Sequence, residues 1–379
     1  MFQALSHRRD MTARFVPARG MSPLPEPLQP RGRAATSNAS GRFERDTREP
    51  FDDGWGETDA APKQIRTTLI KDNSRTIIAT NDSPDISFNR SINPYRGCEH
   101  GCIYCYARPS HAYWGYSAGV DFESMLFFKP GAARLLEQQF RKPYYQVEPI
   151  VIGANTDAYQ PIERQLRLTR SILEVCLRFK HPVSLITKSA AITRDLDILS
   201  ELAALGLVKA AISLTTLDRK LARAMEPRAA TPRRRLEAME ALSKAGVPLT
   251  VMTAPVIPGL TDHEIENLLK ASANAGAQSA GYVLLRLPLE VRDLFHDWLR
   301  KVRPDAADKV INMVRDTRGG MDYSSEFHVR GHGQGPIADM ISKRFRAGVR
   351  RYGLDKDRVK LRCDLFERPL DTEDQLSLF

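Results

Sequence analysis

The chain has 379 residues, 42% of them hydrophobic, and a formal net charge of +10. This hydrophobic content is ordinary for a globular protein, and no apolar run approaches the roughly 18 residues that cross a bilayer. Five cysteines, three of them close together, argue against the evenly paired framework of a small disulfide-rich secreted protein. The N-terminus lacks the apolar core of a signal peptide, so we expect a cytoplasmic protein with no membrane partner.

The positive charge belongs to the part of the chain expected to fold. Residues 1–62 sum to zero and residues 367–379 sum to −3, which leaves +13 for residues 63–366. A basic body fits a polyanionic partner such as nucleic acid. Ordinary solubility charge explains this one observation equally well.

Residues 1–62 are rich in Arg, Pro, Ser and Gly and show little apolar periodicity. A segment of this composition cannot bury enough apolar surface to offset its conformational entropy, so we predict a disordered N-terminal arm. A transit peptide is the alternative, but the acidic residues in the segment argue against it. Met11 and Met21 leave the start of translation open.

A triplet of cysteines, Cys98, Cys102 and Cys105, follows two short extended runs at residues 76–79 and 86–88. A structural zinc site usually takes four protein ligands, often as two separated pairs. Three thiolates on one short loop instead suit a [4Fe-4S] cluster in which one iron lacks a protein ligand. That open iron can bind a substrate or a cofactor directly. A three-ligand zinc site and chance clustering are the alternatives.

Beyond the triplet, short apolar runs alternate with helical patterns. Strands are predicted at residues 127–129, 149–153, 183–187, 208–214, 249–257 and 280–287. Helices are predicted at residues 131–141, 162–179, 195–205, 232–245, 262–275 and 291–302. Strands that alternate with helices of about 10 to 15 residues indicate βαβ units and a parallel sheet, so we predict an α/β fold. Counted from the strand before the triplet, the chain offers six such units.

The cysteine spacing, with Tyr104 just before the third cysteine, resembles that of the radical S-adenosylmethionine (SAM) superfamily. The resemblance implies a partial (β/α)6 barrel of TIM type at residues 63–303. The sequence after this barrel indicates a helical C-terminal extension at residues 304–366 and a flexible tail at residues 367–379. It also implies that the triplet holds a [4Fe-4S] cluster whose open iron chelates SAM. One electron from the cluster then cleaves SAM to a 5′-deoxyadenosyl radical.

Three longer strings make the resemblance more specific. They are residues 93–107 (NPYRGCEHGCIYCYA), residues 156–163 (TDAYQPIE) and residues 226–228 (EPR), and together they are similar to the subgroup related to spore photoproduct lyase. Those lyases reverse a thymine–thymine crosslink in DNA by hydrogen abstraction and return a hydrogen from a cysteine.

We cannot align that hydrogen-donor cysteine with a residue of this chain. Cys176 lies on the apolar face of a predicted helix and is most simply a core residue, while Cys363 falls outside the barrel. The hydrogen donor therefore stays unassigned. Cys176, Cys363 and Tyr106 remain the candidates for a catalytic role.

In barrels of parallel strands, functional residues lie at the carboxyl ends of the strands. The resemblance implies that the loop after the second strand holds the amino group of SAM. The candidates there are Asn155, Thr156 and Asp157. For each hydroxyl at a strand end, a satisfied turn is an equally good explanation.

The later strand ends supply the remaining candidates for SAM binding. Lys188 follows the third strand and could place its ammonium near the SAM carboxylate. Ser213 and Thr215 alternate onto one face at the end of the fourth strand, as hydroxyls that contact a ribose would. By the resemblance, Ile257 after the fifth strand and Tyr104 lie near the adenine.

Arginines near two strand ends are candidates for gripping a nucleic-acid backbone, because guanidinium groups bind phosphate bidentately. They are Arg228, after the fourth strand, and Arg286, at the end of the sixth. The run 233–235 is instead expected on a solvated helix face.

The chain ends in Gln375, Leu376, Ser377, Leu378 and Phe379. This sequence resembles the pentapeptide that bacterial DNA repair and replication proteins insert into the sliding clamp. Its leucines and phenylalanine offer apolar anchors on an extended tail. Docking onto the protein's own surface is the alternative.

Together these observations predict a radical SAM enzyme that abstracts hydrogen from a damaged or modified DNA base, as a lyase of carbon–carbon bonds. DNA, the bacterial sliding clamp and an electron donor such as flavodoxin or ferredoxin are the expected partners. Modification of RNA or protein is a second hypothesis. A nonenzymatic iron–sulfur protein, acting as a redox sensor or a scaffold at the clamp, is a third.

Overall fold

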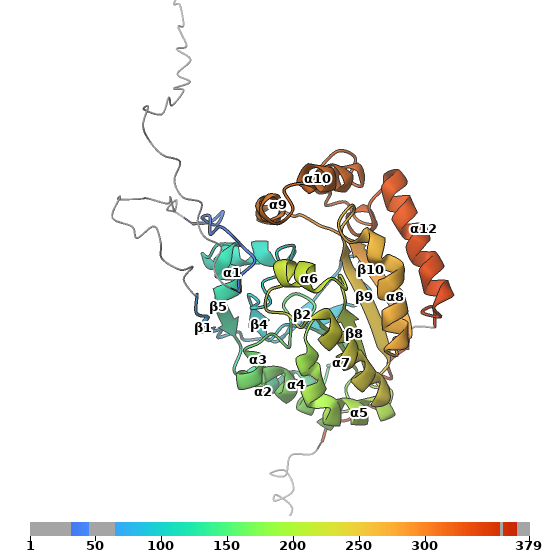
Figure 1. The fold of residues 1–379 in the computed structure, drawn as a ribbon. Helices are drawn as coiled ribbons and strands as arrows, with labels where there is room; N and C mark the ends of the chain where they lie inside the picture. Colours follow the sequence, from blue (N-terminus) through green and yellow to red (C-terminus); the bar gives the residue numbers. More distant parts are fainter. Residues whose placement is uncertain (1–31, 45–64, 357–358, 370–379) are drawn as a thin grey trace, which may run out of the picture.

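The computed structural model describes residues 32–44, 65–356 and 359–369 (Figure 1). The predicted clamp-binding pentapeptide lies outside these residues, as does most of the predicted N-terminal arm. None of the helices in the described part of the chain combines the length and the hydropathy that a bilayer crossing needs.

A curved sheet with the strand order β10-β9-β8-β7-β6-β3-β2 forms the centre of the fold (Figure 1). Its parallel strands are β3 (Arg90–Ile92), β6 (Ile150–Ile152), β7 (Val183–Thr187), β8 (Val208–Ser213), β9 (Leu249–Val256) and β10 (Ser279–Leu284). The edge strand β2 (Ile78–Thr80) is antiparallel to β3. Because β2 and β10 are edges of one sheet, the barrel is open, which confirms the predicted partial-barrel fold class.

Helices surround this sheet and alternate with its strands. The longer ones are α2 (Ala132–Phe140), α4 (Leu168–Arg178), α5 (Leu196–Ala204), α7 (Pro232–Lys244), α8 (Ile265–Asn274) and α9 (Glu290–Val302). Residues at the start of α7 show how the local sequence determines where a helix begins. Thr231 accepts a hydrogen bond from the backbone N–H of Arg234 at the start of α7, and Pro232 is its first residue.

The predicted helix at residues 162–179 is two helices, α3 (Glu163–Leu166) and α4, and the single-helix prediction was wrong. The break is at Arg167, whose φ of +51° ends α3. The carboxylate of Glu163 accepts the backbone N–H groups of Leu168 and Thr169 at 3.0 and 3.1 Å, so it caps α4 from outside the helix.

A second, small sheet carries the cysteine triplet. It contains β1 (Thr68–Lys71), β5 (Met125–Phe128) and β4 (Tyr95–Arg96), in the order β1-β5-β4. β4 leads directly into the cysteines, and a 3-10 helix (Arg108–Trp114) and α1 (Val120–Ser124) follow them. The strand predicted at residues 86–88 was misplaced, because the first strand of the parallel sheet is β3.

Residues 32–44 belong to the arm predicted to be disordered, but the structure packs them against the body. Ala34 and Ala35 are 0% exposed. Their backbone N–H groups donate to the carboxylate of Glu123 at 3.1 and 3.0 Å. Composition failed here because the segment is held by a buried carboxylate and not by apolar periodicity.

The C-terminal extension is helical, as predicted, with α10 (Ala307–Asp316), α11 (Val329–His332) and α12 (Gly335–Arg351). α12 packs along α8 (Figure 1). The segment 359–369 then lies beside the amino end of β8. There the backbone N–H of Arg362 donates to Gly206, just before β8, at 3.1 Å.

Candidate active site

The loop at residues 98–105, here called the cluster loop, lies over the carboxyl ends of the parallel strands. The backbone N–H of Glu99 donates to Gln160 Oε1, in the segment after β6, at 2.8 Å. The backbone N–H of Ile103 donates to the carbonyl of Met225, in the segment after β8, at 3.0 Å. Contacts to two separate strand ends therefore fix the loop where parallel barrels build their sites.

The three cysteines fit an iron–sulfur cluster better than a single metal ion. Within the described residues, no three His, Cys, Asp or Glu side chains are arranged to hold one ion, as a mononuclear zinc site requires. In a [4Fe-4S] cluster each cysteine binds a different iron, so the thiolates can stand further apart. Burial raises the pKa of Cys98 and Cys102, and nearby Asp157 and Glu226 add to the effect. Cluster iron would supply the positive charge that these thiolates need.

An arginine directly beneath the loop holds its backbone. Arg108 is 0% exposed and donates to the carbonyls of Cys102 and Gly101 at 2.8 and 3.0 Å. Its partner is the buried carboxylate of Glu123. Gly101 has a φ of +65°, and a Cβ there would lie 2.8 Å from Glu123 Oε2, so only glycine fits.

The segment predicted to hold the SAM amino group is anchored to the protein. Thr156 donates through Oγ1 to the carbonyl of Tyr95 at 2.8 Å, while the side chain of Asn155 is exposed. Asp157 accepts from Thr187 Oγ1 and from the backbone N–H of Lys188, both at 2.7 Å. Of the three candidates, Asn155 is the one with an exposed side chain.

Asp157 also joins the cluster loop to the sheet. Its Oδ2 lies 3.3 Å from His100 Nδ1. Burial alone would raise the pKa of Asp157, but His100 and the hydrogen bonds from Thr187 and Lys188 outweigh it and hold that pKa below its usual range. The carboxylate is therefore charged and ties together the loops after β6 and β7.

Two of the predicted SAM contacts meet at the third strand end. The ammonium of Lys188 lies 5.9 Å from the centre of the Tyr104 ring. Tyr104 and Ile257, both predicted near the adenine, belong to one buried apolar cluster. Tyr104 therefore lies near Lys188 and belongs to the buried apolar cluster that contains Ile257.

A buried carboxylate organises the fourth strand end. Glu226, 2% exposed, accepts from the hydroxyl of Tyr104, from Thr215 Oγ1 at 3.1 Å and from the guanidinium of Arg235. Arg235 also donates to the carbonyl of Ser213 at 2.9 Å. Ser213 and Thr215 therefore belong to a network that reaches the cluster loop through Tyr104.

Arg235 corrects a prediction. The run 233–235 was expected on a solvated helix face, but Arg235 is 1% exposed. It shares the inward face of α7 with Ala238, Met239 and Leu242, and the carboxylate of Glu226 compensates its charge. Arg233 and Arg234 do point to solvent and pair with Glu237.

The two substrate candidates differ in their surroundings. Arg228 pairs with Glu99 Oε1 at 3.0 Å and so helps to hold the cluster loop. Arg286 lies over the ring of Tyr106, 5.5 Å from its centre, and its Nη2 is 3.3 Å from the hydroxyl of Tyr323. Its buried Nε has no hydrogen-bond partner. Arg286 therefore keeps a donor for a ligand beside the residue that follows Cys105.

Of the three catalytic candidates, the structure places Cys176 and Cys363 apart from the cluster loop, and Tyr106 directly after it. Cys176 is 0% exposed in the core between α4 and the sheet, and burial raises its pKa to about 12. Cys363 lies in the segment beside Gly206, at the amino end of β8. Tyr106 is 47% exposed and donates through its hydroxyl to the carbonyl of Ala154, so it spans two strand ends.

Comparison with known proteins decides the family. A profile described as the Radical SAM superfamily matches residues 92–271, from the end of β3 into α8. A Mycobacterium tuberculosis protein, the uncharacterized Rv2578c, is 34% identical over 232 residues, which cover 61% of this chain and 68% of that protein. The chain belongs to the radical SAM superfamily.

Two further proteins are similar to this chain. The Methanocaldococcus jannaschii protein MJ0683 is 28% identical over 173 residues, 46% of this chain and 62% of that protein. A solved structure of a spore photoproduct lyase mutant with bound AdoMet and dinucleoside spore photoproduct has a TM-score of 0.53 and 14% sequence identity. The match covers 75% of this chain and 79% of that one, and it shows a shared fold.

Radical SAM proteins use a [4Fe-4S] cluster and SAM, so the predicted cofactors are confirmed. Sequence reasoning missed the residues that support the site, above all Glu123 and Glu226. Glu226 stands in one of the strings that carry the resemblance, and its position there was the available signal. Nothing in the sequence marked Glu123, because its partners lie far away along the chain.

Proposed function

We propose that this radical SAM enzyme acts on a damaged or modified base in DNA, as a lyase that breaks a carbon–carbon bond. The observation that carries the proposal is Arg286. Its buried, unpartnered Nε stands next to Tyr106, at the edge of the cluster loop. A buried charged donor without a partner is costly, so it suits a ligand that brings an acceptor such as a phosphate or a base carbonyl.

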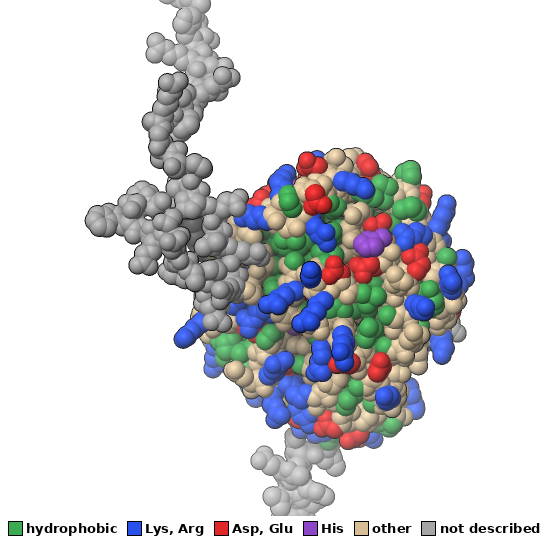
Figure 2. Space-filling view, viewed as in Figure 1, with side chains coloured by type: hydrophobic (Ala, Val, Ile, Leu, Met, Phe, Trp, Pro, Cys, Tyr) green, Lys and Arg blue, Asp and Glu red, His purple; other side chains and the backbone are tan. Residues whose placement is uncertain are grey.

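Charge supports the same substrate. The folded part of the chain carries the positive charge of the protein, and the face in Figure 2 exposes many Lys and Arg side chains. The spore photoproduct lyase structure that shares this fold contains a dinucleoside lesion. A dinucleoside lesion is the kind of substrate that we propose for this chain.

The residues of this chain have distinct tasks in the proposed reaction. When bound, the cluster and SAM supply a radical that abstracts hydrogen. Cys98, Cys102 and Cys105 hold the cluster, and Tyr104 and Lys188 line the side on which we place SAM. Arg286 orients the substrate at the mouth of the barrel. Base damage in a duplex must be extruded before it reaches this position.

Two partners complete the proposal. Reduction of the cluster requires a donor of one electron, for which flavodoxin or ferredoxin is suited. The pentapeptide at residues 375–379 delivers the protein to the sliding clamp. A clamp pulldown with the full chain and with a chain that lacks these five residues tests the second partner, and equal capture of the clamp by both would overturn it.

The substrate is tested by reconstituting the protein anaerobically and adding dithionite, SAM and DNA. We expect 5′-deoxyadenosine, formed faster with damaged DNA than with undamaged DNA. Stimulation by RNA or by a protein extract, and not by DNA, would favour a modification enzyme instead. No 5′-deoxyadenosine under any condition would favour a nonenzymatic redox sensor or scaffold.

A further inference from the structure

Three large aromatic side chains lie exposed next to the cluster loop. Phe43 is 58% exposed, Tyr113 is 71% exposed and Trp114 is 42% exposed. Tyr113 and Trp114 end the 3-10 helix that follows the cysteines, and Phe43 belongs to the segment 32–44. The rings of Phe43 and Tyr113 are in contact, and Trp114 is the next residue along the chain after Tyr113. Grouped exposed rings mark an interaction site more often than single exposed residues do. We call these three residues the aromatic platform.

The platform combines rings with cations. The rings of Phe43 and Tyr113 are 5.2 Å apart, and the guanidinium of Arg42 lies 5.4 and 5.9 Å from their centres. The guanidinium of Arg96 lies 4.3 Å from the centre of the Trp114 ring. Each exposed ring therefore has an arginine beside it.

The protein holds the platform in place. Arg42 pairs with Glu290 at the start of α9 at 2.5 Å, and Arg96 pairs with Asp72 at 2.8 Å. Both arginine side chains remain about one third exposed, at 34% and 36%. Their charged groups can thus contact a ligand without giving up the ion pairs that orient them.

A cavity lies beside the platform, next to Arg42. It has a volume of about 640 Å³ and is lined by Arg42, Leu289, Met321 and Tyr323 among others. Arg42 lies beside the rings of Phe43 and Tyr113, and Tyr323 contacts Arg286, the substrate candidate beside Tyr106. The lining of this cavity therefore includes one neighbour of the platform, Arg42, and one neighbour of Arg286, Tyr323.

We propose that the aromatic platform stacks unpaired bases of the DNA strand that flanks the target base. The inference rests on the proposed DNA substrate and extends it to a stretch of single strand. Proteins bind single strands without sequence preference by combining aromatic stacking with a basic surface. Paired rings flanked by arginines, on a body of positive charge, match that chemistry better than they match an apolar peptide.

The chain itself offers a competing occupant. Residues 45–64 directly follow the platform segment and carry a net charge of −3. If this acidic stretch were the true occupant of the platform, the rings would not contribute to DNA binding. The experiment below separates the two.

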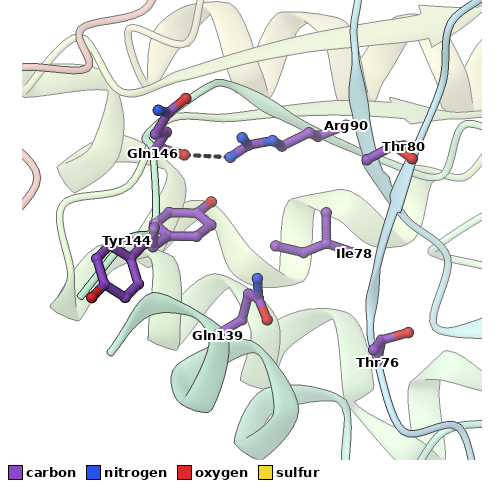
Figure 3. Close-up of a pocket in the computed structure, with 8 residues that line it drawn as sticks. Thr76, Ile78, Thr80, Arg90, Gln139, Tyr144 and Gln146 are labelled. Atoms are coloured by element: carbon purple, nitrogen blue, oxygen red, sulfur yellow. Dashed lines mark hydrogen bonds between the residues drawn. The ribbon is translucent and has the colours of Figure 1, made fainter. Parts of the chain in front are cut away.

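The chain also offers a matched control. Tyr144 is 93% exposed and lines a different cavity, of about 340 Å³, between β2 and the segment after α2 (Figure 3). Arg90 and Gln146 form a hydrogen bond there (Figure 3). None of the predicted site residues lines that cavity. Tyr144→Ala thus removes a tyrosine that is even more exposed than Tyr113, at another place on the surface.

The test is fluorescence anisotropy with a labelled oligothymidylate and the full chain carrying its cluster. We expect Tyr113→Ala and Phe43→Ala to weaken binding by roughly tenfold, as loss of one stacking ring does, while Tyr113→Phe and Tyr144→Ala bind like wild type. Unchanged thermal midpoints and iron contents exclude misfolding. If Tyr113→Ala and Phe43→Ala bind the oligothymidylate with wild-type affinity, the role of the platform is overturned, while the proposed DNA substrate is not. Absence of binding by the wild type to both single-stranded and damaged duplex DNA would overturn the DNA substrate as well.

Discussion

Arg108 and Glu123 form an ion pair, 2.5 Å long and 0% exposed on both sides, directly under the cluster loop. Arg108 donates to two carbonyls of that loop, and Glu123 accepts the backbone N–H groups of Ala34 and Ala35. The pair therefore couples the cysteines to the segment 32–44. The N-terminal segment is a structural part of the site.

Glu123→Ala should destabilise the protein and loosen its cluster. Removing one partner of a buried ion pair costs about 3 to 5 kcal/mol, because the other charge is left uncompensated. Denaturant unfolding and iron content after desalting measure the two effects. Glu237→Ala, which removes an exposed partner of Arg233, should leave the stability nearly unchanged, because solvent screens exposed ion pairs. Equal effects of the two substitutions would contradict this account.

Substituting any one of Cys98, Cys102 and Cys105 by serine should abolish retention of a [4Fe-4S] cluster. All three lie on the cluster loop, and no thiolate would remain to hold the third iron. Iron and sulfide analysis with visible absorption measures the loss. Cys363→Ser is the control, because that cysteine lies at the amino end of β8, and it should retain full iron. If Cys363→Ser lost its iron while the three variants of the cluster loop retained theirs, the assigned ligands would be wrong.

Glu226→Gln should lower the stability and weaken SAM binding while leaving the cluster in place. Glu226 compensates the buried Arg235 and orients Tyr104, so neutralising it costs about 3 kcal/mol, the scale of a broken buried pair. SAM affinity by equilibrium dialysis and a thermal melt measure both effects. Tyr104→Phe removes one hydrogen bond and should weaken SAM binding with a smaller loss of stability. Unchanged SAM affinity in both variants would place SAM elsewhere.

His181 should make the protein sensitive to mild acid. Burial lowers the pKa of His181 to about 3, below the value of about 6.5 expected in the unfolded chain. The unfolded chain therefore binds a proton below pH 6.5 that the folded protein does not. His181 stabilises the fold fully above pH 6.5, and that contribution falls by up to about 4 kcal/mol as the pH drops toward 3.

The measurement is the free energy of unfolding in urea between pH 7.5 and pH 4.5, for the wild type and for His181→Asn. Asparagine retains a donor for the carbonyl of Pro182, which accepts from His181 Nδ1 at 2.9 Å. The variant should lose less stability than the wild type over this range. Parallel pH profiles of the two proteins would show that His181 is not the sensitive group.

The sequence predicted the parts of the molecule that follow from periodicity and spacing. Alternating apolar runs and helices predicted the parallel strands β6 to β10, and the cysteine spacing predicted the cluster loop. Arg235 could also have been found, since it stands three, four and seven residues before Ala238, Met239 and Leu242 on one helix face. The run of three arginines indicated an exposed face, but this spacing places Arg235 on the buried face of α7.

Two features, β4 and the packed segment 32–44, could not be predicted from local sequence patterns. β4 has two residues and forms only because β5, some thirty residues later, pairs with it. The segment 32–44 is held by Glu123, about ninety residues away. Interactions over such separations leave no periodic signal, and the composition of the arm predicted the opposite.

The most direct test of the account follows one hydrogen atom. DNA from cells that lack the protein is prepared with deuterated bases and incubated anaerobically with the reconstituted enzyme, dithionite and SAM. We predict deuterium in the 5′-deoxyadenosine, detected by mass spectrometry, and its loss in Cys102→Ser. 5′-Deoxyadenosine that forms at the same rate without DNA and never carries deuterium would contradict the claim that this radical SAM enzyme acts on DNA.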